Sequence, residues 1–209
     1  MSKKKLMYLV PIMVAGSLMS GCGNGQDRRA ATASTTAEVS ADVSKSKGDL
    51  DAVLASLNAL KGADADADLN KLHDSLKKSA QRLDHSLAEV VASSDDAVKA
   101  GKAQEEAWNK ESHSFTDAQL REASNQRQGD LRKAVDALAK SSQALGAERL
   151  TYTSQLNQTV SALDLDLTRV GLTGIKPTIE GLIKHEGGLR DALSDVAEKI
   201  RAERELVSR

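Results

Sequence analysis

Few side chains in this sequence have the spacing that catalysis or metal binding requires. The chain contains one cysteine, Cys22, so no disulfide can form within it. A di-iron site in a helical bundle needs Glu-x-x-His motifs, and none of the four histidines has a glutamate three residues before it: His73, His85, His113 and His185. Serine-nucleophile and phosphate-binding glycine motifs are also missing from the sequence. We therefore expect a non-enzymatic protein with no cofactor and no metal ion.

The run Asp64-Ala-Asp-Ala-Asp68 has the alternating carboxylates with which a calcium loop begins. Such a loop also needs glycine at its sixth position and glutamate at its twelfth. Leu69 and Ser75 occupy those positions here. We interpret the run as a soluble loop that caps the following helix.

The N-terminal residues have the layout of an export signal. Three lysines, at positions 3–5, precede an apolar stretch from Leu6 to Leu18, and the small residues Ser20 and Gly21 precede Cys22. The apolar stretch is shorter than the roughly 20 residues that cross a bilayer. The pattern predicts a cleaved signal over residues 1–21 rather than a transmembrane helix.

The run Leu18-Met19-Ser20-Gly21-Cys22 resembles the lipobox of bacterial lipoproteins, although leucine is more usual than methionine at position 19. The resemblance implies diacylglycerol on the Cys22 sulfur, cleavage before Cys22 and acylation of the new amino group. It also implies that the protein is held on a membrane of the cell envelope and faces the periplasm. An aspartate at position 23 would retain an enteric lipoprotein at the inner membrane, so Gly23 favours the outer membrane.

Residues 23–36 are small and polar, and we expect them, with Cys22, to form a flexible tether. Loss of the leader lysines leaves 26 basic and 30 acidic residues, which does not favour nucleic acid as a partner. Aromatic residues make up only 2% of the chain. The core must therefore consist of Leu, Val, Ile and Ala, a composition that suits long helices packed side by side.

Seven-residue spacing of apolar positions dominates residues 37–209 and predicts an all-α, coiled-coil-like bundle of four helices. The expected core lines are Val39, Val43, Leu50, Val53, Leu57 and Leu60; Leu69, Leu76, Leu83, Val90 and Ala97; Leu131, Leu138, Leu145 and Tyr152; Val135, Leu156, Leu163 and Val170; and Ile175, Ile179, Leu182, Leu189, Leu193, Val196, Ile200 and Val207. Ser46 interrupts the first line.

Three breaks separate the predicted helices. Gly62 and the acidic run form the first. At the second, Thr116 and Gln119 suggest a capping box, with Phe115 and Leu120 in the positions of a hydrophobic staple. The third break lies at residues 171–174, and Pro177 is expected in the first turn of the fourth helix.

These breaks predict helices over roughly 66–113 and 117–170, about 70 and 80 Å long. The shorter first and fourth helices pack beside one end of this pair. The other end, around residues 108–126, is expected to project as a two-helix hairpin, held away from the membrane anchor. Residues 95–135 are expected to be the least stable part of the domain. Trp108 and Phe115 lie near this tip and either plug the hairpin or contact a partner.

The run from Trp108 to Glu111, followed by Ala118 to Arg127, resembles an uncharacterised family of bacterial helical envelope lipoproteins with a W-x-x-E…L-R-x-x-S pattern. The similarity covers roughly residues 45–205, although this chain is richer in Ala and Ser and poorer in aromatic residues. The resemblance implies a helical fold and an envelope setting, and it implies no activity.

Two functions remain open at this point. The first is a membrane-anchored helical scaffold or adaptor that binds an envelope protein. The alternative is a periplasmic bundle that senses stress or binds a small ligand, which would need a pocket lined by polar groups.

Overall fold

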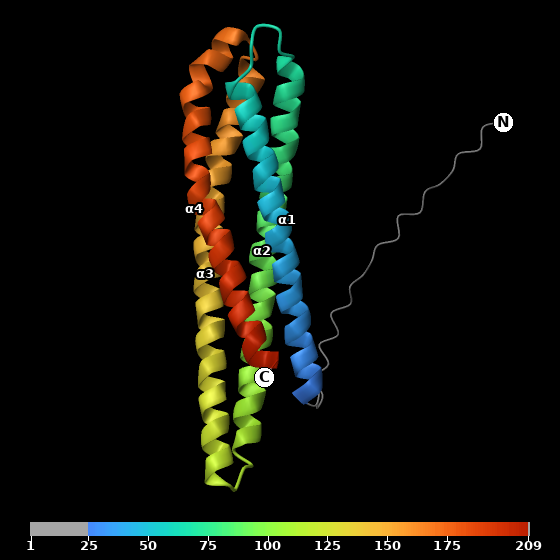
Figure 1. The fold of residues 1–209 in the computed structure, drawn as a ribbon, viewed down its shortest axis with the longest axis vertical. Coiled ribbons are helices and arrows are strands. Elements are labelled where there is room, and N and C mark those ends of the chain that lie inside the picture. Colours follow the sequence, from blue (N-terminus) through green and yellow to red (C-terminus); the bar gives the residue numbers. More distant parts are fainter. Residues whose placement is uncertain (1–24, 209) are drawn as a thin grey trace, which may run out of the picture.

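The computed structural model describes residues 25–208, which form four long helices joined by short loops (Figure 1). The helices are α1 (Gly25–Lys61), α2 (Leu69–Ser112), α3 (Ala118–Leu165) and α4 (Arg169–Ser208). Each helix runs antiparallel to the next, and α1 also packs against α4, so the four helices form a closed ring. The predicted all-α bundle of antiparallel helices is confirmed.

The seven-residue lines form the core of this bundle. Nearly all of the apolar positions predicted for the core are buried, including Leu50, Leu83, Leu138 and Leu193, each of which is fully shielded from solvent. Polar side chains share the core with them: Ser46, the weak point of the first line, is fully buried, and its hydroxyl has no hydrogen-bond partner.

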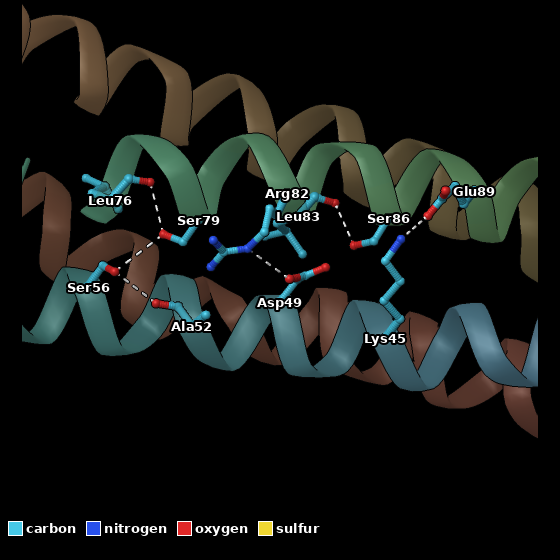
Figure 2. A network of polar contacts seen from close by, with 10 residues as sticks. All are labelled: Lys45, Asp49, Ala52, Ser56, Leu76, Ser79, Arg82, Leu83, Ser86 and Glu89. Atoms are coloured by element: carbon cyan, nitrogen blue, oxygen red, sulfur yellow. Dashed lines mark hydrogen bonds and ion pairs between the residues drawn. The ribbon is translucent and has the colours of Figure 1, made fainter. Parts of the chain in front are cut away.

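The contact between α1 and α2 is close because small residues separate the two helices. Ser79 and Ser86 are buried there, and each donates its hydroxyl to a backbone carbonyl one turn earlier on α2 (Figure 2). Charged pairs bridge the rim of the contact, with Lys45 Nζ 2.6 Å from Glu89 Oε2. Such exposed pairs contribute little to stability individually, so this helix pair depends mainly on its buried side chains.

The loop between α2 and α3 projects beyond the start of α1 and the end of α4, which confirms the hairpin (Figure 1). With 44 and 48 residues, α2 and α3 are about 66 and 72 Å long. The start of α3 differs from the predicted capping box. Asp117 rather than Thr116 caps α3, because its carboxylate accepts hydrogen bonds from the backbone N–H groups of Gln119 and Leu120 at 2.8 and 3.0 Å.

The expectation of a flexible tether is wrong for residues 25–36, which belong to α1. Thr32 and Thr36 are buried, and their hydroxyl groups lie within hydrogen-bond distance of backbone carbonyls one turn earlier, at 3.1 and 2.9 Å. These two threonines continue the seven-residue lines of Val39 and Val43 toward the N-terminus. Small side chains that satisfy their own hydroxyl groups thus extend the packed face without large apolar residues.

The break between α3 and α4 also differs from the prediction, because it lies at residues 166–168 rather than 171–174. Thr168 accepts a hydrogen bond from the Gly171 N–H at 3.1 Å, as a side chain at a helix start does. Gly171 is needed for close packing, since a Cβ there would lie 2.3 Å from the Asp166 carbonyl oxygen. Val170 is consequently exposed rather than in the core, and Pro177 lies inside α4 rather than in its first turn.

None of the described helices combines the length and the apolar character that crossing a membrane requires.

Candidate interaction site at the hairpin end

Trp108 lies where the hairpin leaves the four-helix bundle. The side chain is partly buried against the core, and its indole N–H donates a hydrogen bond to the Ser124 hydroxyl at 2.8 Å. The Arg127 guanidinium lies over the ring, 5.1 Å from its centre. Trp108 therefore joins α2 to α3, as the plug interpretation predicts, while part of its surface stays accessible.

Two open recesses meet at Trp108 and Gln104. One, of about 220 Å³, lies between α1 and α2 and is lined by Arg28, Arg29, Gln104, Trp108 and Glu111. The other, of about 210 Å³, lies among α2, α3 and α4 and is lined by Gln104, Trp108, Arg127, Asp130, Leu131, Leu206 and Val207. Aromatic, cationic, anionic and amide groups thus surround one corner of the bundle.

Gln104 connects this corner to α1. Its side chain is buried, and its Oε1 lies 2.8 Å from the Thr32 hydroxyl. On the neighbouring α3, buried Gln128 donates from Nε2 to the Glu105 carbonyl at 3.3 Å. An ion pair between Arg28 and Glu111 ties the first turns of α1 to the last turn of α2. The start of α1 therefore lies beside the base of the hairpin.

Glu203 is the most unusual side chain of this end. It is fully buried on α4, and neither carboxylate oxygen has a hydrogen-bond partner. Burial alone raises the pKa of Glu203 to about 7. Gly101 of α2 makes room for it, because a Cβ there would lie 2.8 Å from Glu203 Oε1 and 2.5 Å from Val135 Cγ2.

Our sequence interpretation did not identify Glu203, although a signal for it exists. Glu203 follows Leu182, Leu189 and Val196 at intervals of seven residues and so falls on a core line of α4. A carboxylate on an apolar line of this kind predicts a buried acid that is either partnered or neutral.

The tip of the hairpin carries exposed apolar groups. Phe115 and Leu120 are 38% and 60% exposed, so they do not form the closed staple that the sequence predicts. Arg121 donates to the Phe115 carbonyl from Nη2 at 3.0 Å and fixes the turn. Trp108 and Phe115, the two predicted partner contacts, therefore have different environments: one is packed and the other faces solvent.

The remaining sequence candidates are scattered. Cys22 lies outside the described residues. The four histidines lie far apart along the chain, and only His73 is buried, with Nε2 3.2 Å from Asp164 Oδ1. Within the described part of the chain, no three His, Asp or Glu side chains lie close enough together to hold a metal ion. The Asp68 carboxylate caps α2 by accepting from the Lys71 N–H at 3.1 Å, as the loop interpretation predicts.

The chain matches no protein-family model, no curated protein and no solved structure.

Proposed function

We propose that this chain is a lipid-anchored protein of the bacterial cell envelope, whose helical bundle is a non-enzymatic scaffold for a protein partner. The observation that carries the proposal is the position of Cys22, which follows a signal-like segment and precedes the start of α1 by three residues. Three residues span at most about 11 Å. Lipid on Cys22 would therefore hold the rigid bundle directly against the membrane.

The shape of the bundle supports the scaffold role. Two helices of about 70 Å form a rod that can bridge the space above a membrane surface. At the base of the hairpin, this rod has a corner where exposed Arg127 lies over the partly buried Trp108. Tryptophan and arginine are enriched among the residues that dominate protein interfaces, so we assign the partner contact to this corner.

The anchor is tested by growing cells with labelled palmitate. The native chain should incorporate the label, and Cys22→Ser should not, because the thioether to the lipid cannot form. Ser20→Thr is a matched control that leaves Cys22 in place and changes a neighbouring residue only slightly. Equal labelling of the native chain and Cys22→Ser would refute the anchor.

The partner is tested by photo-crosslinking in living cells. A photoreactive side chain replaces Arg127 at the corner or, as a control, Leu150, which is exposed on the middle of α3. We expect one discrete crosslinked product from position 127 and none from position 150. The same set of products from both positions would refute a dedicated contact at this corner.

The second candidate function is a sensing bundle, and Glu203 is the observation that favours it. An acid with a pKa of about 7 beneath the corner changes its charge near neutral pH. Ionisation of this buried, unpartnered group would destabilise the contact between α2 and α4. A change in crosslinking from position 127 between acidic and neutral medium, abolished by Glu203→Gln, would support this candidate.

A further inference from the structure

We infer that the hairpin tip faces the lipid bilayer and that Phe115 and Leu120 enter its interfacial layer. The inference rests on the proposed lipid anchor and adds an orientation and a second contact to it. It reverses the expectation from the sequence, in which the tip was held away from the membrane. The reversal is motivated by the start of α1, which lies at the hairpin end of the bundle (Figure 1).

The geometry of the start of α1 carries the argument. The Arg28–Glu111 ion pair places the first turn of α1 beside the last turn of α2. Beyond this point only the last turns of α2, the hairpin loop and the first turns of α3 project farther along the bundle axis (Figure 1). Cys22 is three residues before Gly25 and is separated from it by at most about 11 Å. A lipid on Cys22 therefore brings the membrane surface to the level of the tip.

The side chains of the tip suit that surface. Phe115 and Leu120 expose apolar area close to one another along the chain, on either side of the turn that Asp117 caps. The neighbouring side chains include Lys110 and Arg121, which are cationic, and both are exposed. Three acidic side chains, Glu111, Asp117 and Glu122, lie in the same segment. Exposed apolar residues beside cationic ones match the boundary between acyl chains and phosphate groups.

The opposite end of the bundle also has exposed apolar residues. The loop between α1 and α2 carries Asp64, Asp66 and Asp68, and Asp164 and Asp166 lie at the end of α3. Leu165 and Val170 are also exposed there, at 89% and 80%. Exposed apolar residues and acidic side chains therefore occur at both ends. The position of the anchor selects the hairpin end as the membrane-facing one.

Tryptophan fluorescence tests this orientation directly. The chain from Cys22 to Arg209 has one cysteine, which can be coupled to a maleimide-bearing phospholipid in phosphatidylcholine vesicles. Trp108→Phe removes the only tryptophan and provides a common background. Phe115→Trp or Leu120→Trp then reports on the tip, and Leu165→Trp reports on the opposite end from a position that is even more exposed.

In vesicles of brominated phosphatidylcholine, we expect both tip reporters to lose fluorescence and to shift their emission to shorter wavelength. The reporter at position 165 should keep its fluorescence. Unquenched tip reporters, or equal quenching at both ends, would overturn the orientation. Because the anchor is coupled chemically, these outcomes do not depend on lipidation in cells. Palmitate labelling can therefore fail while the tip reporters are quenched, and it can succeed while they are not, so the failure of the anchor and the failure of the orientation are distinguishable.

Discussion

Glu203 and Gly101 form a matched pair at the residue scale. A buried carboxylate without a partner is stable only when it is protonated, and a glycine opposite it leaves the space that the carboxyl group fills. Gly101 and Val135, which line the space beside Glu203, carry no charge, and burial is the sole cause of the raised pKa of Glu203. Its titration therefore reports on the closure of this end.

The first prediction concerns the pH dependence of stability. The folded chain binds the Glu203 proton with a pKa of about 7, against an ordinary value of 4.5. The free energy of unfolding that this group contributes is therefore fully present below about pH 4.5 and is lost as the pH rises to about 7. The loss is on the order of 3 kcal/mol.

Denaturant unfolding at about pH 5 and about pH 8 measures this loss, which Glu203→Gln should largely remove. Glu198→Gln is the control, since the Glu198 side chain is 72% exposed on the same helix and should leave the pH dependence unchanged. An identical pH dependence of the native chain and Glu203→Gln would contradict a neutral, buried Glu203.

The second prediction uses two glycines that differ only in their surroundings. Gly101→Ala should destabilise the fold by about 1–3 kcal/mol, because the added methyl group overlaps Val135 and Glu203. Gly146→Ala on α3 meets no atom within 4 Å and should stabilise by about 0.5–1 kcal/mol through helix propensity. Chemical denaturation of both variants measures the difference, and changes of the same sign would be inconsistent with the close contact at Gly101.

At the scale of single helices, regular spacing predicted what the helices bury, and short polar segments decided where they begin and end. The line from Leu131 to Tyr152 is buried as the sequence indicates. The end of α3 was misplaced because Asp166 and Thr168 terminate the apolar line before Val170. Capping side chains and glycines can both mark the end of a helix, and the spacing of apolar residues does not show which of the two marks it.

The start of α1 was missed for a related reason. The first turns of α1 have the small, polar composition of a linker, but Thr32 and Thr36 within them are buried. The decisive partner, Gln104, is 72 residues away along the chain, so no local pattern announces the contact. The sequence indicated Trp108 as a possible partner contact but not the recesses around it, because they form only when this segment and the end of α4 close over Trp108.

The third prediction tests whether residues 25–36 belong to the packed bundle. Thr36→Asp places a charge in a fully buried position and should lower the free energy of unfolding by at least about 2 kcal/mol. Ser34 is exposed on the same turn, and Ser34→Asp should change the free energy of unfolding by less than about 0.5 kcal/mol. Equal, small effects in thermal melting would indicate a tether after all.

At the scale of the whole molecule, stability should vary along the bundle axis. The sequence placed the weak region at residues 95–135, on the assumption that the first and fourth helices are short. In the structure, α1 reaches Glu111 through Arg28, and α4 brings Leu206 and Val207 against the recess at Gln104 and Leu131. Four helices therefore support most of the segment that was expected to have only two.

The last prediction follows from that difference. Beyond Glu111, α2 and α3 have only each other, and one narrow stripe buries little apolar surface (Figure 1). Amide hydrogen exchange should therefore be fast over residues 112–123 and slow around Leu76 and Leu193, which are fully buried. Residues 97–104 should resemble the slow group, because Ala97, Gly101 and Gln104 are buried beneath α1 and α4. Fast exchange that extends inward to Ala97 would mean that the ends of α1 and α4 do not hold the hairpin base, and Thr36→Asp should then leave this exchange pattern unchanged.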